Sequence, residues 1–296
     1  MEFDFELYKV FYYVASAKNL TKASELMHIS QPAITKHIKN LESQLKMSLF
    51  IRTKRGVILT ESGIQIFEQV KNMIICAKNI DNIATTFSDI QTGTIKIGAG
   101  KSMIRNFIIP ALTRYKKERI DISIDLTIRP TSELLDKLKK GEIDFVFSKF
   151  PKSKDSTLEY KKLGVLHDIL ITNKDYPELL NRKVRLDELQ KYPLILPQSI
   201  SESEKRLEGV LKQNNLKFNA NIRVGSLSII TKLVHDGHGI GLVTKEYAKD
   251  SINDNDIFEI DIVPKLSIIE YGIIVMPSLI LSTASKKFIE YLQIKE

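Results

Sequence analysis

The sequence is poor in cysteine, tryptophan and long apolar runs. Its single cysteine, Cys76, cannot form an internal disulfide, which fits a reducing compartment such as the cytoplasm. No run of about 18 consecutive apolar residues occurs, so no membrane span is predicted. The first residues, MEFDFELYKVF, are acidic and amphipathic and lack the basic and apolar regions of a secretory signal peptide. We therefore expect a cytoplasmic protein with no part in the membrane.

The motifs of common catalytic and cofactor sites are absent or incomplete. Gly100-Lys101-Ser102 imitates the end of a phosphate-binding P-loop, but Ile95 stands where that loop needs its first glycine. Gly237-His238-Gly239-Ile240-Gly241 lacks the full spacing and the acidic residue of a dinucleotide loop. His235 and His238 have no third metal ligand nearby, and no GxSxG elbow occurs. We expect no enzymatic activity, no cofactor and no metal.

Positive charge is abundant and locally concentrated. The 296 residues carry a formal net charge of +8, which suits a polyanionic partner. Residues 1–90 hold 11 Lys and Arg against 9 Asp and Glu, so the overall excess does not mark a DNA site. A local cluster is more informative, because residues 36–55 hold six cations and one acid, Glu42. The cations are Lys36, Lys39, Lys46, Arg52, Lys54 and Arg55.

Residues 19–60 are predicted to form two short helices, a tight turn and a basic hairpin. Ser30 is the expected N-cap of the second helix, and Pro32 lies in its first turn. One helix stripe is apolar: Ile34, Ile38, Leu41 and Leu45. The polar residues off this stripe are Gln31, Thr35, Lys36, Lys39 and Ser43. Such a helix can bury one face in a small core and place the other in the major groove of DNA.

The hairpin after this helix is expected to act as a wing. Gly56 is a candidate turn between two short strands, and cations surround the tip. Lys39, Arg52, Lys54 and Arg55 are expected to hold phosphates, while Gln31 and Thr35 read bases.

These residues resemble the signature of the LysR-type transcriptional regulators. The matching segments are Ser30-Gln31-Pro32-Ala33, Leu49-Phe50-Ile51-Arg52 and Leu59-Thr60-Glu61-Ser62-Gly63. The resemblance implies a winged helix-turn-helix DNA-binding domain at 1–60, an all-α unit apart from its wing, and a linker and dimerisation helix at 61–91. It also implies an α/β two-lobed effector-binding module at 92–296, similar to periplasmic solute-binding proteins. Lobe I is expected at about 92–162 and 268–296, and lobe II at about 163–267.

Residues 60–90 are predicted to form one long helix capped by Thr60. Apolar residues recur along it at alternating steps of four and three, the period of a coiled-coil seam. The predicted seam consists of Ile66, Val70, Met73, Ala77, Ile80, Ala84 and Phe87. A lone helix this apolar needs a partner, which we expect to be the helix of a second subunit; packing on its own chain is the alternative.

Strand-like and helix-like segments alternate from residue 92 onward, which favours an α/β architecture with mostly parallel sheets. Two crossings between lobes are expected, near 151–163 and near 264–267. In the resembled family the effector lies between the lobes, at strand-to-helix junctions. The candidate effector-binding residues at such junctions are Lys101, Ser102, Met103, Thr131, Ser132, Phe147, Ser148, Gln198, Ser199 and Ser201. Thr131 and Ser132 are also expected to cap the helix that follows them.

The sequence thus predicts a sequence-specific transcriptional regulator controlled by a small-molecule effector. Its expected partners are double-stranded promoter DNA, a small molecule and further copies of itself, as a dimer or tetramer; RNA polymerase is another candidate. The net positive charge and the hydroxyl residues at the strand-to-helix junctions favour a small anion, such as a carboxylate, as the effector. Two other classes remain open: a small-molecule enzyme or transport binding protein with an accessory domain, and an architectural DNA binder that ignores sequence.

Overall fold

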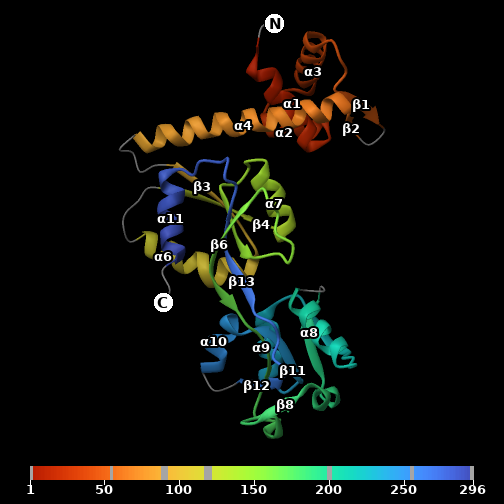
Figure 1. The fold of residues 1–296 in the computed structure, drawn as a ribbon, viewed down its shortest axis with the longest axis vertical. Coiled ribbons are helices and arrows are strands. Elements are labelled where there is room, and N and C mark those ends of the chain that lie inside the picture. Colours follow the sequence, from red (N-terminus) through yellow and green to blue (C-terminus); the bar gives the residue numbers. More distant parts are fainter. Residues whose placement is uncertain are drawn as a thin grey trace.

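The computed structural model describes residues 3–53, 56–87, 93–116, 122–198, 202–253 and 257–293. A small helical domain lies at one end of the molecule, a long helix crosses beneath it, and two α/β lobes follow (Figure 1). Within the described ranges, no helix combines the length and apolar character that crossing a membrane requires.

The N-terminal domain is built as the apolar pattern predicts. Its elements are α1 (Phe5–Ala17), α2 (Leu20–Met27), α3 (Gln31–Leu45), β1 (Phe50–Thr53) and β2 (Gly56–Leu59). The Oγ of Ser30 accepts a hydrogen bond from the N–H of Ala33 at 3.3 Å, which confirms the predicted N-cap of α3. Ile34, Ile38 and Leu41 are buried against α1 and α2, so the apolar stripe of α3 is also confirmed.

The first half of α4 (Glu61–Phe87) packs on its own N-terminal domain. Val70 is 1% exposed in the core of that domain, and Phe67 stacks on Tyr12 with ring centroids 5.8 Å apart. Ile66 and Met73 pack partly buried against the same core. The protein's own chain therefore covers Val70, so its predicted place in an intersubunit seam is wrong, whereas the seam role of the half-buried Ile66 and Met73 stays a prediction. A heptad stripe fits any adjacent apolar helix, and here α1 is that helix.

Among the described side chains of the predicted seam, only those toward the end of α4 are exposed in the single chain. Ile80 is 68% exposed and Ala84 is exposed, whereas Ala77 is half-buried. The side chain of Phe87 lies outside the described residues.

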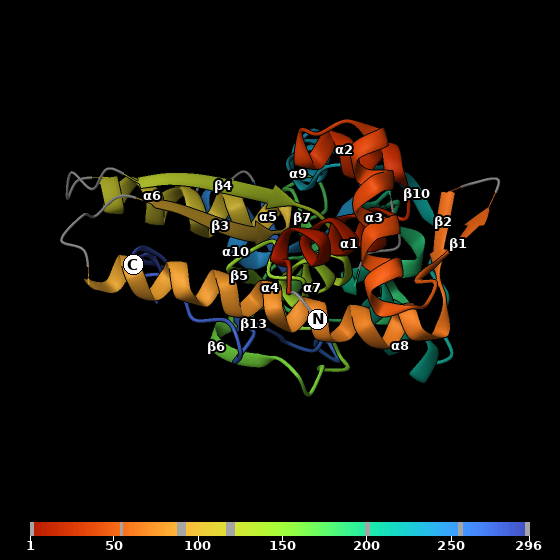
Figure 2. The same ribbon diagram turned by 90° about the horizontal axis from the view of Figure 1, so that it is seen from above.

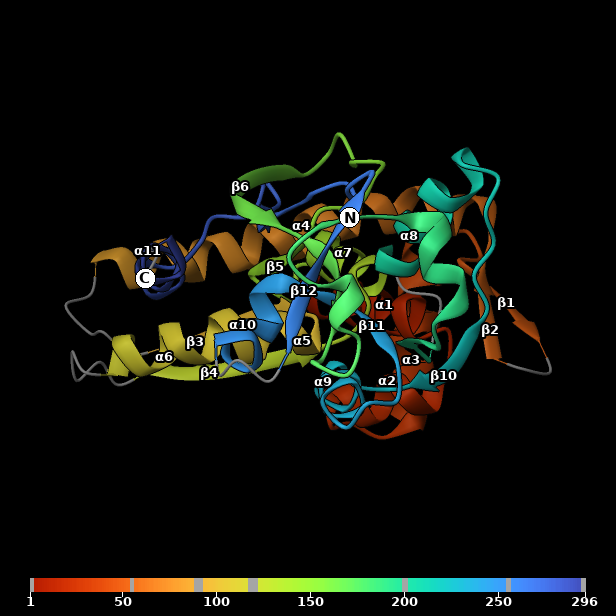
Figure 3. The same cartoon turned by 90° about the horizontal axis from the view of Figure 1, so that it is seen from below.

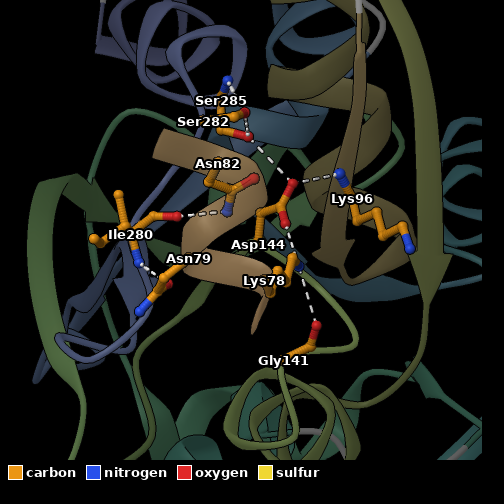
Figure 4. A network of polar contacts seen from close by, with 9 residues as sticks. All are labelled: Lys78, Asn79, Asn82, Lys96, Gly141, Asp144, Ile280, Ser282 and Ser285. Carbon is orange, nitrogen blue, oxygen red and sulfur yellow. Dashed lines mark hydrogen bonds and ion pairs between the residues drawn. The ribbon is translucent and has the colours of Figure 1, made fainter. Parts of the chain in front are cut away.

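Polar side chains of α4 dock this helix onto lobe I (Figure 4). The Nζ of Lys78 lies 2.7 Å from Oδ1 of Asp144 and donates to the carbonyl oxygen of Gly141 at 3.0 Å. The amide of Asn79 donates to the carbonyl of Ser278 at 2.8 Å and accepts from the N–H of Ile280 at 2.7 Å. The long helix is therefore held between the N-terminal domain and lobe I.

Apolar and aromatic contacts add to this junction. Ile75 is buried with Leu134 and Leu138 of lobe I. The hydroxyl of Tyr12 donates to the carbonyl oxygen of Lys140 at 3.0 Å, which joins α1 directly to lobe I. Burial raises the pKa of Tyr12 to about 12, and the charge of Glu142 adds to this shift. The phenol therefore stays protonated and remains a donor.

Lobe I is a five-stranded sheet in the order β4-β3-β5-β13-β6, with apolar cores on both faces. Its strands are β3 (Gly93–Ala99), β4 (Ile122–Ile128), β5 (Phe145–Lys149), β6 (Glu159–Leu166) and β13 (Ile269–Val275). Its helices are α5 (Lys101–Met103), which continues through a π-helical turn (Ile104–Ile108) into α6 (Ile109–Lys116), then α7 (Thr131–Lys139) and α11 (Thr283–Gln293).

Lobe II is a six-stranded sheet in the order β10-β9-β11-β7-β12-β8, again with a core on each face. Its strands are β7 (Asp168–Thr172), β8 (Lys183–Arg185), β9 (Leu194–Pro197), β10 (Ala220–Val224), β11 (Ile240–Thr244) and β12 (Phe258–Val263). Its helices are α8 (Glu202–Gln213), α9 (Leu227–His235) and α10 (Lys245–Asn253), with 3-10 turns at Pro177–Leu179 and Leu186–Lys191. Helices α8 and α10 lie on opposite sides of β11 and β12 (Figure 3).

Both sheets are mixed, so the prediction of mostly parallel sheets is confirmed only in part: among the described strands of the two lobes, five of the nine pairings are parallel. β3 pairs in parallel with β4 and β5, but β13 runs antiparallel to β5 and β6. In lobe II, β7 is antiparallel to both of its neighbours, β11 and β12. The cause is the double crossing between lobes, because the chain enters lobe II after β6 and returns in the opposite sense before β13.

The crossing points refine the predicted lobe boundaries. β6 continues to Leu166 inside the sheet of lobe I, so the first crossing falls at His167, beyond the predicted 162/163 boundary. The second crossing lies between Val263 and Ile269, where it was predicted.

Candidate DNA-binding surface and interlobe cavity

The polar side of α3 faces away from the core of its domain. Gln31, Pro32, Lys36 and Lys39 are exposed, as is the N-cap residue Ser30. The Oγ1 of Thr35 donates to the carbonyl oxygen of Gln31 at 3.1 Å, so this half-buried hydroxyl is engaged within its own helix. An exposed face with an amide and two ammonium groups is suited to base edges and phosphates.

The β1–β2 hairpin adds cationic surface beside α3. It projects past α3 at one end of the molecule (Figure 2). Arg52 is exposed on β1, opposite Val57 on β2. Lys54 and Arg55 lie outside the described residues. Helix and hairpin together have the arrangement of a winged helix-turn-helix, in which the helix enters the major groove and the wing contacts the backbone.

Gly56 fixes where the hairpin sits on the domain. Its φ is +136°, and a Cβ on this residue would lie 2.3 Å from the carbonyl oxygen of Lys18. The next residue, Val57, donates its N–H to that same carbonyl at 3.1 Å. The glycine therefore allows the wing to pack directly on the end of α1.

A cavity of about 460 Å³ lies between the two lobes. Lobe I contributes its wall at the start of α5 and lobe II contributes the turn before α9 and the helix α10. The lining residues are Lys101, Ser102, Arg105, Asn106, Gly225, Ser226, Leu227, Ser228, Thr231, Val243, Tyr247, Ala248, Asp250 and Ser251. Its lining carries hydroxyl groups, two cations and one acid, Asp250, and this net positive charge is suited to a polar small molecule with negative charge.

A smaller cavity of about 180 Å³ adjoins it and shares Ser102, Gly225, Ser226, Leu227 and Val243. The residues found in the smaller cavity alone are Lys149, Pro197, Ser203, Val224, Leu242 and Thr244. We refer to this smaller space as the inner cavity. It is bounded by the end of β5 in lobe I and by strand ends of lobe II.

A buried carboxylate organises the lobe II side of the inner cavity. Oδ1 of Asp168 accepts hydrogen bonds from Ser203 Oγ at 2.9 Å and from Thr244 Oγ1 at 3.1 Å. Its Oδ2 accepts from Nε of Arg206 at 2.9 Å, and the guanidinium is itself largely buried. Asp168 is thus fully paired, and its hydrogen bonds fix the positions of the two hydroxyls.

Lys149 reaches from lobe I to lobe II. Its Nζ lies 3.4 Å from Oγ1 of Thr244 and 5.4 Å from the ring centroid of Tyr247. Burial lowers the pKa of Lys149 below its ordinary value, and the charge of Asp168 opposes this shift only in part. Burial also raises the pKa of Tyr247, whose hydroxyl donates to Sδ of Met103 at 3.0 Å.

The predicted effector-binding residues are placed unequally around this site. Lys101 and Ser102 line the larger cavity. Met103 and Phe147 are buried in the core of lobe I. Ser132 and Gln198 are exposed, while Ser199 and Ser201 lie outside the described residues.

The predicted capping role of Thr131 is wrong. Pro130 is the N-cap residue of α7, with no side-chain cap. Thr131 is the first helical residue and so lies one position past the N-cap, and its hydroxyl instead pairs with Oγ of Ser148 at 2.6 Å.

Sequence reasoning missed the most chemically distinctive members of the cavities: Lys149, Ser203, Ser226, Thr244 and Tyr247. One signal was available, since Lys149 follows Ser148 at the end of a strand that was expected to reach the cleft. The others come from strand ends and helix starts whose convergence depends on the order of strands in lobe II.

Comparison with known proteins covers both parts of the chain. The family model described as "Bacterial regulatory helix-turn-helix protein, lysR family" matches residues 5–64, and "LysR substrate binding domain" matches residues 88–295. The HTH-type transcriptional activator CmpR of Synechocystis sp. is 24% identical over 238 residues, which cover 80% of this chain and 77% of that protein. A probable RuBisCO transcriptional regulator of Thalassiosira pseudonana is 26% identical over 281 residues, covering 91% and 92%.

Solved structures share the fold over the full length. A full-length OxyR variant from Pseudomonas aeruginosa aligns with a TM-score of 0.72 at 19% identity, covering 99% of this chain and 94% of that one. Full-length CbnR in complex with its target DNA aligns with a TM-score of 0.53 at 20% identity, covering 98% and 99%.

Proposed function

Because the chain belongs to the LysR family of transcriptional regulators, we propose specific roles for its DNA-facing and cavity-lining residues. In this proposal Gln31 and Thr35 read base edges, with Ser30 and Pro32 at the leading end of α3. Phosphates are held by Lys36, Lys39, Arg52, Lys54 and Arg55. The observation that carries the proposal is the division of α3 into a buried apolar stripe and an exposed face with Gln31, Lys36 and Lys39.

The base-reading role is tested by Gln31→Ala, with Gln44→Ala as a matched control. Gln44 is an exposed glutamine near the other end of α3. A preferred DNA site is first selected with the full-length protein from a random duplex pool, and affinities are measured for this site and for a scrambled duplex. Loss of one good base contact costs about 1–3 kcal/mol on the selected site only, or about 5- to 150-fold in affinity.

Three outcomes decide between the roles. A loss confined to the selected site supports base reading by Gln31. An equal loss on both duplexes, or no loss on either, contradicts it. Lys39→Gln should weaken binding to both duplexes alike. It should also reduce the slope of log affinity against log salt concentration by about one, because one phosphate contact is lost.

The interlobe cavities are proposed as the effector site. They lie between two lobes joined by only two crossings, so a ligand that contacts both lobes favours one interlobe geometry. Lobe I also contacts α4 through Lys78 and Asp144, which gives the effector a physical route to the DNA-binding domain. In the proposal Lys101 and Ser102, which line the larger cavity, contact the effector, and Thr131, Ser148, Gln198, Ser199 and Ser201 are further candidates, of which Ser199 and Ser201 lie outside the described residues. A small anion is the expected ligand.

Self-association is proposed to use the exposed end of α4. Ile80 and Ile83 are large apolar side chains that are 68% and 42% exposed in the single chain. A second subunit that covers them removes apolar surface from water. A dimer would also place two copies of α3 on two half-sites of a promoter, and pairing of dimers would give the tetramer.

The proposal includes no catalytic role and places the protein in the cytoplasm, with the DNA that it binds. Its support is that the curated relatives reported above are named as transcriptional regulators. Hydrolysis of a nucleotide or an ester by the purified chain would contradict the non-enzymatic part.

A further inference from the structure

The inner cavity contains one cation whose hydrogen-bonding capacity is largely unused. The ammonium of Lys149 has three N–H donors. Within the described part of the chain it makes one hydrogen bond, to Thr244 Oγ1, and at 3.4 Å that bond is long. Its other close partner is the face of the Tyr247 ring, which supplies attraction without accepting a conventional hydrogen bond.

The charge of Lys149 is not balanced inside the cavity. None of the described residues that line the inner cavity is acidic. Asp168 lies behind Ser203 and Thr244, but both of its oxygens are occupied, and Arg206 at 2.9 Å supplies its counter-charge. Glu246 is held by the ring and backbone N–H of His167, at 2.7 and 3.0 Å. The immediate surroundings therefore leave one positive charge for a ligand.

The remaining lining explains what kind of anion fits. Hydroxyls of Ser102, Ser203, Ser226 and Thr244 border the cavity and can donate to or accept from an oxygen of the ligand. Pro197, Leu227, Leu242 and Val243 supply an apolar wall. A doubly charged group would need a second cation, such as a guanidinium that binds it through two N–H groups. Arg206, in the described part of the chain, already binds Asp168.

We propose that Lys149 is the charge anchor for the effector, and that the effector is a small organic monocarboxylate whose apolar part lies against this wall. The proposal rests on the proposed interlobe effector site and adds its anchoring residue and ligand class. The carboxylate replaces Thr244 and the Tyr247 ring as the main partner of the ammonium. Since Lys149 belongs to lobe I and Ser203 and Ser226 to lobe II, one bound carboxylate links both lobes.

The test uses thermal melting of the full-length protein at constant ionic strength in chloride. The probes are acetate, propionate, pyruvate and benzoate, with sulfate and inorganic phosphate as inorganic anions. We expect at least one carboxylate to raise the melting temperature in a saturable way. Lys149→Met should raise its apparent Kd at least tenfold, and Lys149→Arg should recover part of the affinity.

Lys152→Met is the matched control. Lys152 is an exposed lysine three positions further along the same segment, so this variant removes the same charge from outside the inner cavity. Its carboxylate affinity should equal that of the unmodified protein. Melting in chloride alone, together with binding to the selected DNA site, verifies that each variant is folded.

Several results would contradict the proposal that Lys149 anchors the carboxylate. They are no carboxylate response in the unmodified protein, an unchanged Kd in Lys149→Met, an equal loss in Lys152→Met, or sulfate and phosphate shifts as large as those of every carboxylate. If Ser226→Ala weakens carboxylate binding and Lys149→Met does not, the interlobe effector site stands and the anchor fails. Sequence-specific DNA binding is measured separately, so its loss would contradict the proposed function without bearing on Lys149.

Discussion

The docking of α4 onto lobe I should depend on Lys78. This residue and Asp144 form an ion pair across the junction, with side chains 24% and 7% exposed and 2.7 Å between Nζ and Oδ1. Asp144 also accepts from the N–H of Lys96 at 2.9 Å and from Ser285 Oγ at 3.1 Å. Lys78→Met would leave a buried carboxylate with its two neutral donors but without its counter-charge.

The expected cost follows from this geometry. Removing one partner of a fully buried pair costs about 3–5 kcal/mol. Here Lys78 is partly exposed and Asp144 keeps two hydrogen bonds, so we expect about 2 kcal/mol for opening the junction. That corresponds to about 30-fold faster amide exchange in the part of α4 that relies on lobe I for its protection.

Hydrogen–deuterium exchange of the peptide spanning residues 71–84 measures this effect. Lys71→Met is the control, because Lys71 lies on the same helix but pairs at 2.5 Å with Glu68, a neighbour on its own helix that is 56% exposed. Such a pair contributes at most about 0.5 kcal/mol, or about twofold in exchange. Equal exchange in the two variants, or no change in Lys78→Met, would refute the role of the ion pair.

A double-mutant cycle with Asp144→Asn isolates the pair itself. Lys78→Met in the Asp144→Asn background should cost much less than it does alone, because the buried charge is already gone. Full additivity of the two changes would show that Lys78 acts through something other than Asp144.

Three further predictions concern packing, charge and assembly. Gly63→Ala should destabilise the protein by about 1–3 kcal/mol in denaturant unfolding, because the new Cβ would lie 2.2 Å from the carbonyl oxygen of Leu49. Gly209→Ala in α8 is the control: its Cβ meets nothing within 4 Å, so this variant should stabilise the protein by up to about 1 kcal/mol. Lys149→Met should raise the melting temperature of the ligand-free protein at pH 7 by about 2 °C or more, since burial lowers the pKa of Lys149 and charging it disfavours the folded state. This gain should vanish as pH rises from the lowered pKa to 10.5, where the lysine of both states becomes neutral; a constant gain would contradict the charge argument. Ile80→Glu should shift sedimentation toward a monomer without loss of helix content, and an unchanged dimer would place the interface elsewhere.

Local signals were sufficient for the N-terminal domain. The Ser30 cap, the stripe Ile34-Ile38-Leu41 and the two strands of the wing each depend on residues close together in sequence, and the structure contains them as predicted. Gly56, predicted as the turn, is instead the first residue of β2, opposite Thr53.

Elements with polar or interrupted patterns were missed. β6, with the sequence EYKKLGVL, is an edge strand with exposed lysines, so its apolar signal is weak. β8 is only three residues long, and α10 follows β11 without an intervening turn residue. β6 pairs with β13, β8 pairs with β12 and α10 packs against α9, and none of these contacts can be recognised from a single segment.

The sequence alone determined the two-part architecture and the exposed polar face of α3, because capping, periodicity and charge act over one or two helical turns. Only the tertiary structure decided which neighbour covers the apolar stripe of α4, since a heptad pattern is equally compatible with α1 and with a second subunit. It also decided that Lys149, Thr244 and Tyr247 meet between the lobes. Lys149 is 95 positions from Thr244 in the chain, and the two crossings of the chain between the sheets bring them together.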